Sequence, residues 1–343
     1  MAERIAAAAL PTVNEADAAA FFRGKTITWT IGYNPGGGAD TQARLLAVHL
    51  PKYIPGNPEV VVTNVPGADS LLAAQQLLRR QGTGLELGHF SQGHIIKSLT
   101  GTPVEGFDPF APLYVGMVDA GGGSSSFCAR TEVADNLNAF LNSSRPLRVA
   151  ETSSVSNPAP VMELMRILNL PIQMVYGYGG TAEIRASFDR KETDATNRCG
   201  DPDIPNFPHW LGENFATPLF FFGPEPPEVM QPLLAQGKYP WYKNLKEVVR
   251  MTPAQEKALD TYMGLNGNHV HALPPRTPEN LANAVKRGWI LAVRDPQYVQ
   301  DLRQRGQDYA PITGDDLRQR IEEFKSLPPE TVEILGKMYA GGN

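Results

Sequence analysis

The chain has 343 residues, of which 42% are hydrophobic and 20% charged, and its formal net charge is −5. This length is comfortable for two domains, and the composition is that of a globular protein. The negative charge argues against nucleic acid or an anionic membrane as a partner, and no apolar run is long enough for a membrane span. We therefore expect no nucleic-acid binding and no direct membrane insertion.

The N-terminal residues before Gly24 are rich in alanine, which predicts a short helix or a loose arm. The first residues lack the length and the basic flank of a secretion signal. We interpret the chain as a mature protein that begins at an added methionine, without its signal peptide. The two cysteines, Cys128 and Cys199, are too few for a disulfide framework or a cysteine metal site. They form one bridge or remain two thiols, and the sequence leaves both possibilities open.

A glycine loop follows the first predicted strand. Thr26–Ile31 is β-branched, aromatic and alternating, as strands are, and apolar residues recur at helical spacing from Ala43 to Leu50. The helix therefore begins at the loop, where its first amides lack partners and favour an anion. The loop is either an ordinary tight turn or an anion site. Its candidate ligand-binding residues are Tyr33, Pro35, Gly36, Gly37, Gly38, Ala39 and Asp40.

Nucleotide binding is disfavoured at this loop. Thr41 stands where a dinucleotide fingerprint needs glycine, and the Gly-Lys-Ser/Thr sequence of a P-loop is absent.

Two further strands continue the same rhythm. Val60–Thr63 predicts a strand that ends in the loop 64–70, and Leu85–Phe90 predicts another that ends in 91–94. Repeated strand, loop and helix predict a parallel sheet whose ligand lies beyond the carboxyl ends of the strands. The segment 88–93 resembles a nucleophile elbow, but its first glycine is misplaced by one position. Ser91 and His94 are therefore polar residues of a ligand site or, alternatively, the nucleophile and base of a hydrolase.

A second series of strands begins after a Gly/Ser run, 121–126. Phe127–Ala129 predicts a strand that crosses between domains, and Leu147–Ala150 predicts a strand followed by a polar loop and a helix. We expect Asn157 to be the N-cap of this helix. Because prolines 158 and 160 lack amide protons, side chains would supply any anion contact. These are Thr152, Ser153, Ser154, Ser156 and Asn157; a serine-rich turn without ligand is the alternative.

The next strands end in Tyr178–Thr181 and in the polar segment 197–201. Thr181 is expected to cap the following helix. Arg198 offers a fork for a carboxylate or pairs with Asp194 or Asp201.

The C-terminal part begins with a strand and continues as helices. His269 and His271 lie on one side of a predicted strand. No third metal ligand is near in sequence, which favours a strand returning between domains over a metal site. From Thr277 to Met338 the pattern is helical.

Four segments resemble landmark motifs of the Bug solute-binding proteins, the periplasmic receptors of tripartite tricarboxylate transporters. They are Tyr33–Asp40, Asn64–Ala68, Tyr178–Thr181 and Pro274–Glu279, and the resemblance extends from Lys25 to Ile321. It implies a type II periplasmic-binding-protein fold: two α/β domains, joined by two crossing strands, with a ligand cleft between them. It also implies a small carboxylate held by the loop 35–40 from one side and the loop 152–157 from the other.

Several positions depart from the family pattern. Glu151 and two prolines replace parts of a Gly/Ser-rich loop, Tyr178 stands where lysine is usual, and 197–201 replaces a more apolar strand. The segment 218–267 is longer and more aromatic than is typical. These departures leave the fold as expected but favour an aromatic carboxylate or a dicarboxylate as ligand.

The resulting hypothesis is a non-enzymatic receptor that captures a small carboxylate by domain closure and delivers it to the membrane subunits of such a transporter. We expect a periplasmic monomer with no cofactor and no metal. Domain 1 comprises residues 24–126 and 268–343, and domain 2 comprises 127–267. The alternatives are the hydrolase and a sensor that serves a signalling partner. Besides the residues of the two loops, the expected ligand contacts are Ser91, His94, Tyr178, Gly179, Arg198 and Asp201.

Overall fold

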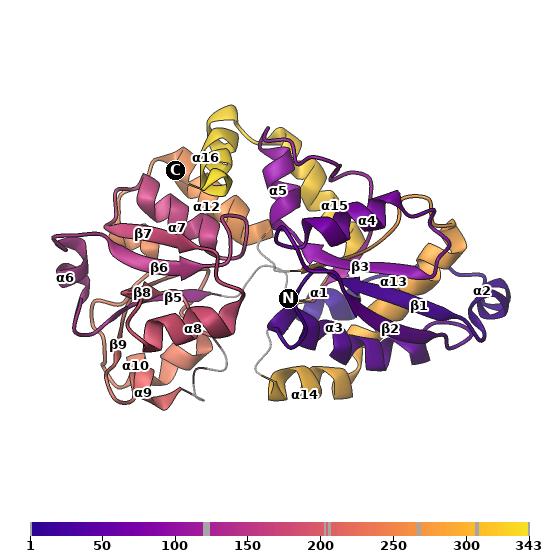
Figure 1. Ribbon diagram of the computed structural model, residues 1–343, viewed down its shortest axis with the longest axis horizontal. Coiled ribbons are helices and arrows are strands. Elements are labelled where there is room, and N and C mark those ends of the chain that lie inside the picture. Colours follow the sequence, from indigo (N-terminus) through magenta and orange to yellow (C-terminus); the bar gives the residue numbers. More distant parts are fainter. Residues whose placement is uncertain are drawn as a thin grey trace. The chain divides into compact units, whose positions relative to one another are not determined.

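The computed structural model describes residues 2–118, 124–201, 204, 207–265, 269–305 and 309–341. The chain divides into two compact units, Met1–Gly121 with Leu265–Leu327 and Gly122–Gly264 with Pro328–Asn343. Each unit is built on one β-sheet with helices packed against it, which confirms the predicted α/β class (Figure 1). Among the described residues, the sequence-based division differs from these units at 124–126 and 328–341, which lie in the second unit, and its boundary at 267/268 falls outside the described residues.

The first unit contains a mixed sheet with the strand order β11-β4-β10-β3-β1-β2. β1, β2 and β3 are parallel, as the repeated pattern predicted, whereas β10 is antiparallel to β3 and β4, and β11 is antiparallel to β4. The carboxyl ends of the three parallel strands therefore meet at one edge of the sheet. The strands are β1 (Thr26–Ile31), β2 (Glu59–Asn64), β3 (Glu86–Ser91), β4 (Leu113–Met117), β10 (His269–Leu273) and β11 (Ile312–Thr313).

Helices pack against this sheet through two apolar clusters. One cluster joins Trp29 of β1 to Leu46 of α3 and Trp289 of α13, and the other joins Phe90 of β3 to Leu77 of α4. The helices, including the short turns η1 and η4, are α1 (Ala2–Ala7), α2 (Glu15–Phe22), α3 (Gly38–His49), η1 (Leu50–Tyr53), α4 (Leu71–Arg79), α5 (Gly93–Leu99), α13 (Glu279–Arg294), α14 (Pro296–Gln304), α15 (Gly314–Glu323) and η4 (Phe324–Ser326).

The second unit contains a sheet with the order β7-β6-β8-β5-β9. β6 is parallel to β7 and β8, and β5 is antiparallel to β8 and β9. The strands are β5 (Ser125–Arg130), β6 (Leu147–Glu151), β7 (Ile172–Tyr176), β8 (Ala195–Thr196) and β9 (Ala216–Phe222). The helices are α6 (Leu137–Leu141), α7 (Ala159–Ile167), α8 (Thr181–Asp189), α9 (Pro208–Leu211), η3 (Glu228–Met230), α10 (Gln231–Ala235), α11 (Leu245–Val248), α12 (Pro253–Leu265) and α16 (Pro329–Ala340).

Three features of this unit differ from the sequence expectations or extend them. β9 is a fully buried strand within a proline- and aromatic-rich segment that had no clear pattern. The yellow helix α16 packs against α7 (Figure 1). The Gly/Ser run 121–126 lies partly outside the described residues, and its last two residues open β5.

Candidate functional site

The glycine loop after β1 opens directly into α3. Gly37 is the N-cap and supplies no side chain, so nothing within the described chain caps the helix. Pro35 to Gly38 are exposed, and no described residue accepts a hydrogen bond from the amides of Gly38 and Ala39. These amides are positioned at the positive end of the helix dipole, where an anion is favoured.

Asp40 holds this loop in shape. It is 3% exposed, and its carboxylate accepts hydrogen bonds from the Gly36 N–H at 2.9 Å, Arg44 Nε at 2.8 Å and Asn64 Nδ2 at 2.8 Å. Burial opposes the charge, but these hydrogen bonds outweigh it and hold the pKa of Asp40 below its ordinary value. Asp40 therefore stabilises the conformation of the glycine loop from its buried side.

The loop after β2 contains three consecutive residues in a left-handed backbone conformation, which the sequence did not predict. Ala68, Asp69 and Ser70 all have positive φ, at 48°, 50° and 72°, conformations that cost non-glycine residues on the order of 1–3 kcal/mol each. Gly32 permits this loop to approach, because a Cβ on Gly32 would lie 2.2 Å from the Cβ of Ser70. Ser70 Oγ in turn accepts the Ser91 N–H at 2.7 Å, which links the ends of β1, β2 and β3.

Ser91 and His94 do not form a nucleophile–base pair. Ser91 Oγ accepts the Gly93 N–H at 3.1 Å, and His94 Nε2 donates to the Asp69 carbonyl at 2.8 Å. Both side chains are buried, and burial lowers the pKa of His94. Each side chain forms a hydrogen bond with the backbone, and these bonds stabilise the ends of the loops.

The ring of Tyr33, a candidate ligand contact, packs against imidazole rings of the first unit. Its ring centroid lies 5.0 Å from that of His269, and His89 lies 4.7 Å from His269 and 4.9 Å from His271. The sequence missed this third imidazole because it belongs to β3, far from β10 along the chain. The planes of the His269 and His271 rings are tilted by 33° and 38° to that of His89, and burial together with the neighbouring imidazoles lowers the pKa of His89. Across the described ranges no group of three His, Cys, Asp or Glu residues is arranged to hold a metal ion.

In the second unit, the hydroxyls of the loop after β6 mostly bond within the chain. Ser153 Oγ accepts from the amides of Val155 and Ser156, Ser156 Oγ donates to the Ser153 carbonyl, and Ser154 Oγ donates to the carbonyl of Tyr339 in α16. Thr152 is half-buried at the start of this loop.

Both helix caps predicted for this unit are wrong by one residue. Pro158 is the N-cap of α7, and the Asn157 side chain instead accepts a hydrogen bond from Tyr262 Oη. Gly180, not Thr181, is the N-cap of α8. Close by, the Gly179 N–H donates to Glu183 at 2.9 Å, and Tyr178 is half-buried.

Arg198 pairs with Glu151 and not with Asp194 or Asp201. Glu151 ends β6 with no exposure, and its Oε1 lies 3.3 Å from Arg198 Nη2 and 2.8 Å from Asn197 Nδ2. Asp194 is taken by three other arginines, 130, 145 and 148, and Asp201 pairs with Arg185 at 2.7 Å. The carboxyl ends of β6 and β8 thus bring together a guanidinium and a buried carboxylate.

A disulfide fixes the segment that carries Arg198. Cys128 of β5 and Cys199 are joined, with a Cα–Cα distance of 6.4 Å, and both are fully buried. This settles the question that the sequence left open. The bridge attaches the residue next to Arg198 covalently to the sheet.

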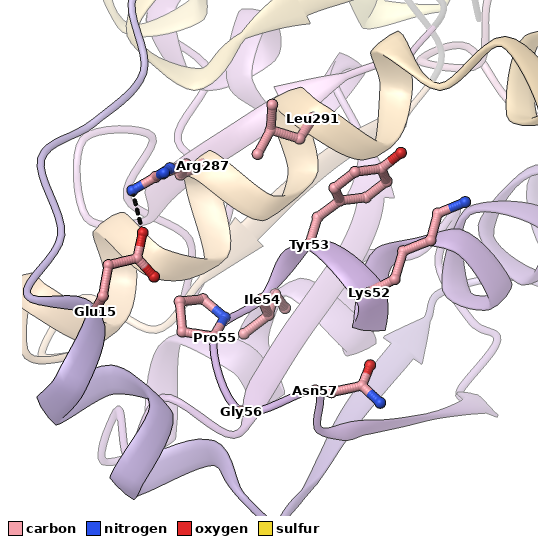
Figure 2. Close-up of a pocket in the computed structure, with 9 residues that line it drawn as sticks. All are labelled: Glu15, Lys52, Tyr53, Ile54, Pro55, Gly56, Asn57, Arg287 and Leu291. Atoms are coloured by element: carbon pink, nitrogen blue, oxygen red, sulfur yellow. Dashed lines mark ion pairs between the residues drawn. The ribbon is translucent and has the colours of Figure 1, made fainter.

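A separate hollow of about 380 Å³ lies at the opposite end of the first sheet (Figure 2). It is lined by residues 53–57, which precede β2, and by Arg287 of α13, whose guanidinium pairs with Glu15 at 2.6 Å. It lies away from the carboxyl ends of the strands, so it is not the predicted anion site.

No helix in the part of the chain that the structure describes has both the length and the apolar character needed to cross a bilayer. Neither a family model nor a curated protein matches the chain.

Solved structures, in contrast, match over most of the chain. The periplasmic binding protein BugD shares 15% identity with a TM-score of 0.60, covering 88% of this chain and 96% of its own. MatC from Rhodopseudomonas palustris with bound malate shares 17% with a TM-score of 0.59, covering 90% and 99%. An R. palustris protein with adipate shares 16% with a TM-score of 0.64, covering 91% and 97%. The chain therefore has the two-domain α/β fold of Bug-type periplasmic solute-binding proteins, as the sequence resemblance predicted.

Proposed function

We propose that this protein is an extracytoplasmic receptor, not an enzyme, that binds a small carboxylate at the carboxyl ends of its parallel strands. The observation that carries the proposal is that each unit has unused hydrogen-bond donors at this edge. In the first unit they are the amides of Gly38 and Ala39 at the uncapped start of α3. In the second unit they belong to Arg198, whose Nε and Nη1 have no hydrogen bond to a described residue.

Capture of the acid by closure of the two units is part of the proposal. A carboxylate held by both units would exclude water and strengthen each contact, since electrostatic interactions grow as the local dielectric falls. Each charge-assisted hydrogen bond contributes on the order of 1.5–3 kcal/mol. Two or three such bonds total about 3–9 kcal/mol before the costs of ordering are subtracted, whereas micromolar binding corresponds to about 8 kcal/mol, so further contacts to the ligand must contribute.

Two observations support the class of ligand that we propose. The structures that resemble this one include proteins with malate and with adipate, both dicarboxylates. The aromatic segment 218–267 of this chain keeps an aromatic acid among the candidates. We propose a dicarboxylate or an aromatic carboxylate.

The partners of such a receptor are the membrane subunits of a tripartite tricarboxylate transporter, to which the closed, monomeric protein would deliver its ligand in the periplasm. This step rests on the family resemblance. Uptake of the ligand by cells with and without this protein tests it.

A thermal-shift screen tests binding. Aliphatic and aromatic mono-, di- and tricarboxylates are compared with their neutral amides, which match them in shape. We expect at least one acid to raise the melting temperature while its amide does not. Stabilisation by neutral compounds or cations alone would contradict the proposal.

A further inference from the structure

The carboxylate of Glu151 is enclosed by donors from the surrounding loops. Asn197 Nδ2 lies at 2.8 Å and Arg198 Nη2 at 3.3 Å from Oε1. The Ser156 hydroxyl, which donates to the Ser153 carbonyl, lies 3.5 Å from Oε2. Glu151 itself has no exposed surface. It is therefore a counter-ion placed behind Arg198, out of reach of solvent.

The Glu151 carboxylate binds Arg198 but does not use all of its hydrogen-bond donors. Nη2 makes three long contacts, to both carboxylate oxygens of Glu151 and to the Asn157 carbonyl at 3.5 Å. Nε is buried without a partner, and the side chain keeps 16% exposure. Of the five N–H donors of a guanidinium, the two on Nη1 of Arg198 have no hydrogen bond to a described residue, so they can meet a second carboxylate.

Binding an acid on Arg198 would place two carboxylates beside one cation. The charged groups packed nearby do not compensate for this. Asp201 adds negative charge and is paired with Arg185, while Glu163 of α7 is paired with Arg166. Tyr176 of β7 and Tyr262 of α12 face the same carboxylate, and their pKa values are raised, so both stay neutral. Two buried carboxylates that share one site do not both stay ionised at neutral pH.

We propose that Glu151 takes up one proton when an acid binds to Arg198, so that ligand capture is linked to protonation. The proton comes from solvent and forms an O–H bond on the Glu151 carboxyl, and the carboxylate of the ligand replaces it as the counter-ion of Arg198. No other bond forms or breaks. The inference rests on the proposed function and assigns Glu151 as a positioning residue that also sets the pH dependence.

The electrostatics of the unliganded protein agree with this assignment. Burial is the largest influence on Glu151 and raises its pKa from the ordinary range, whereas Arg198 and Asn197 lower it only in part. A ligand carboxylate would raise it further by like-charge repulsion. Between the free and bound pKa values, the dissociation constant of the acid should rise up to about tenfold per pH unit, as one linked proton requires.

Calorimetry with adipate, malate and benzoate as probes tests the inference. Titrations from pH 6 to 8 in two buffers of different ionisation enthalpy give the number of protons bound with the ligand. We expect uptake approaching one proton in the wild type and none in Glu151→Gln, whose amide keeps the shape and can still accept from Arg198. Glu163→Gln removes another buried glutamate of the same unit and should leave the uptake unchanged.

An infrared difference spectrum of the wild type provides a check that does not depend on the variant folding. Ligand binding should produce the C=O band of a protonated carboxylic acid, which a histidine cannot give. Binding without proton uptake, without this band, or with uptake retained in Glu151→Gln would overturn the inference and leave the receptor function standing. Failure of all three probes to bind would instead remove the proposed function, and the inference with it.

Discussion

The guanidinium of Arg198 lies 3.3 Å from the carboxylate of Glu151, measured from Nη2 to Oε1. Glu151 ends β6 and Arg198 follows the end of the neighbouring parallel strand β8 by two residues, so the sheet itself brings them together. The pair leaves part of the guanidinium unused, and the acid binding that we propose for this unit depends on this part.

The start of α3 can be tested by filling the loop mouth at Gly37. This residue has φ −76°, and an added Cβ would come no closer than 3.7 Å to the Asn34 carbonyl, so larger residues fit without distorting the fold. We expect Gly37→Val to abolish acid binding, because the ligand loses its approach to hydrogen bonds worth on the order of 1.5–3 kcal/mol each. Gly37→Ala, the matched control, should show a smaller loss. Calorimetry that finds equal affinity in wild type and Gly37→Val would count against the loop as a binding site.

The disulfide should stabilise the second unit and keep Arg198 in place. Its cysteines are 71 positions apart, for which chain entropy predicts roughly 4 kcal/mol of stabilisation. We expect the double variant Cys128→Ser, Cys199→Ser to unfold at clearly lower urea concentration and to bind the acid severalfold more weakly. An unchanged unfolding midpoint in the reduced wild type would contradict this.

Asp194 should be the main acid-sensitive residue of the second unit. It is buried and accepts hydrogen bonds from Arg130 at 3.0 Å and Arg145 at 2.7 Å. Burial acts to raise its pKa, but these hydrogen bonds outweigh burial and lower the pKa below the ordinary value. The folded pKa is therefore below the unfolded one, so the stabilisation is present above about pH 4 and is lost as the pH falls further.

Urea unfolding between pH 3 and 7 measures this effect. Asp194→Asn should lose about 3–5 kcal/mol at neutral pH, because it removes the buried carboxylate shared by three arginines and leaves Arg130 only its pair with the exposed Glu132, and it should show a weaker pH dependence. Glu192→Gln is the control: its carboxylate is on the surface beside Arg190, and its loss should be much smaller, because solvent screens an exposed ion pair. Equal losses in the two variants would refute the assignment.

The hydrolase alternative predicts turnover that depends on Ser91, and we expect none. Ser91 and His94 are each bonded to the backbone and not to one another. Mass spectrometry of simple carboxylic esters incubated with the protein should recover them unchanged beyond the buffer background. Hydrolysis by the wild type that disappears in Ser91→Ala would support the hydrolase alternative.

Local patterns were enough to predict most elements of the site. Alternation and glycines located β1 and the start of α3, since both depend on neighbours within a few residues. The pairing of Glu151 with Arg198 spans 47 positions, and the contact between the His89 and His269 rings joins two strands that only the folded sheet brings together. Such partners depend on strand order, which the sequence pattern does not specify.

The misplaced cap of α7 and the missed strand β9 each have a structural reason. Asn157 was expected to cap α7 from its residue type, but Tyr262 of α12 binds its side chain instead. Pro218 and the phenylalanines around it obscured β9, whose residues are buried on both faces and therefore show no alternation.

A crystal structure with the acid that gives the largest thermal shift tests the central claim most directly. We predict carboxylate oxygens at hydrogen-bond distance, about 2.7–3.2 Å, from the amide of Gly38 or Ala39 and from a guanidinium nitrogen of Arg198. An acid bound elsewhere, for example in the hollow beside Arg287, with neither group in contact, would contradict the account.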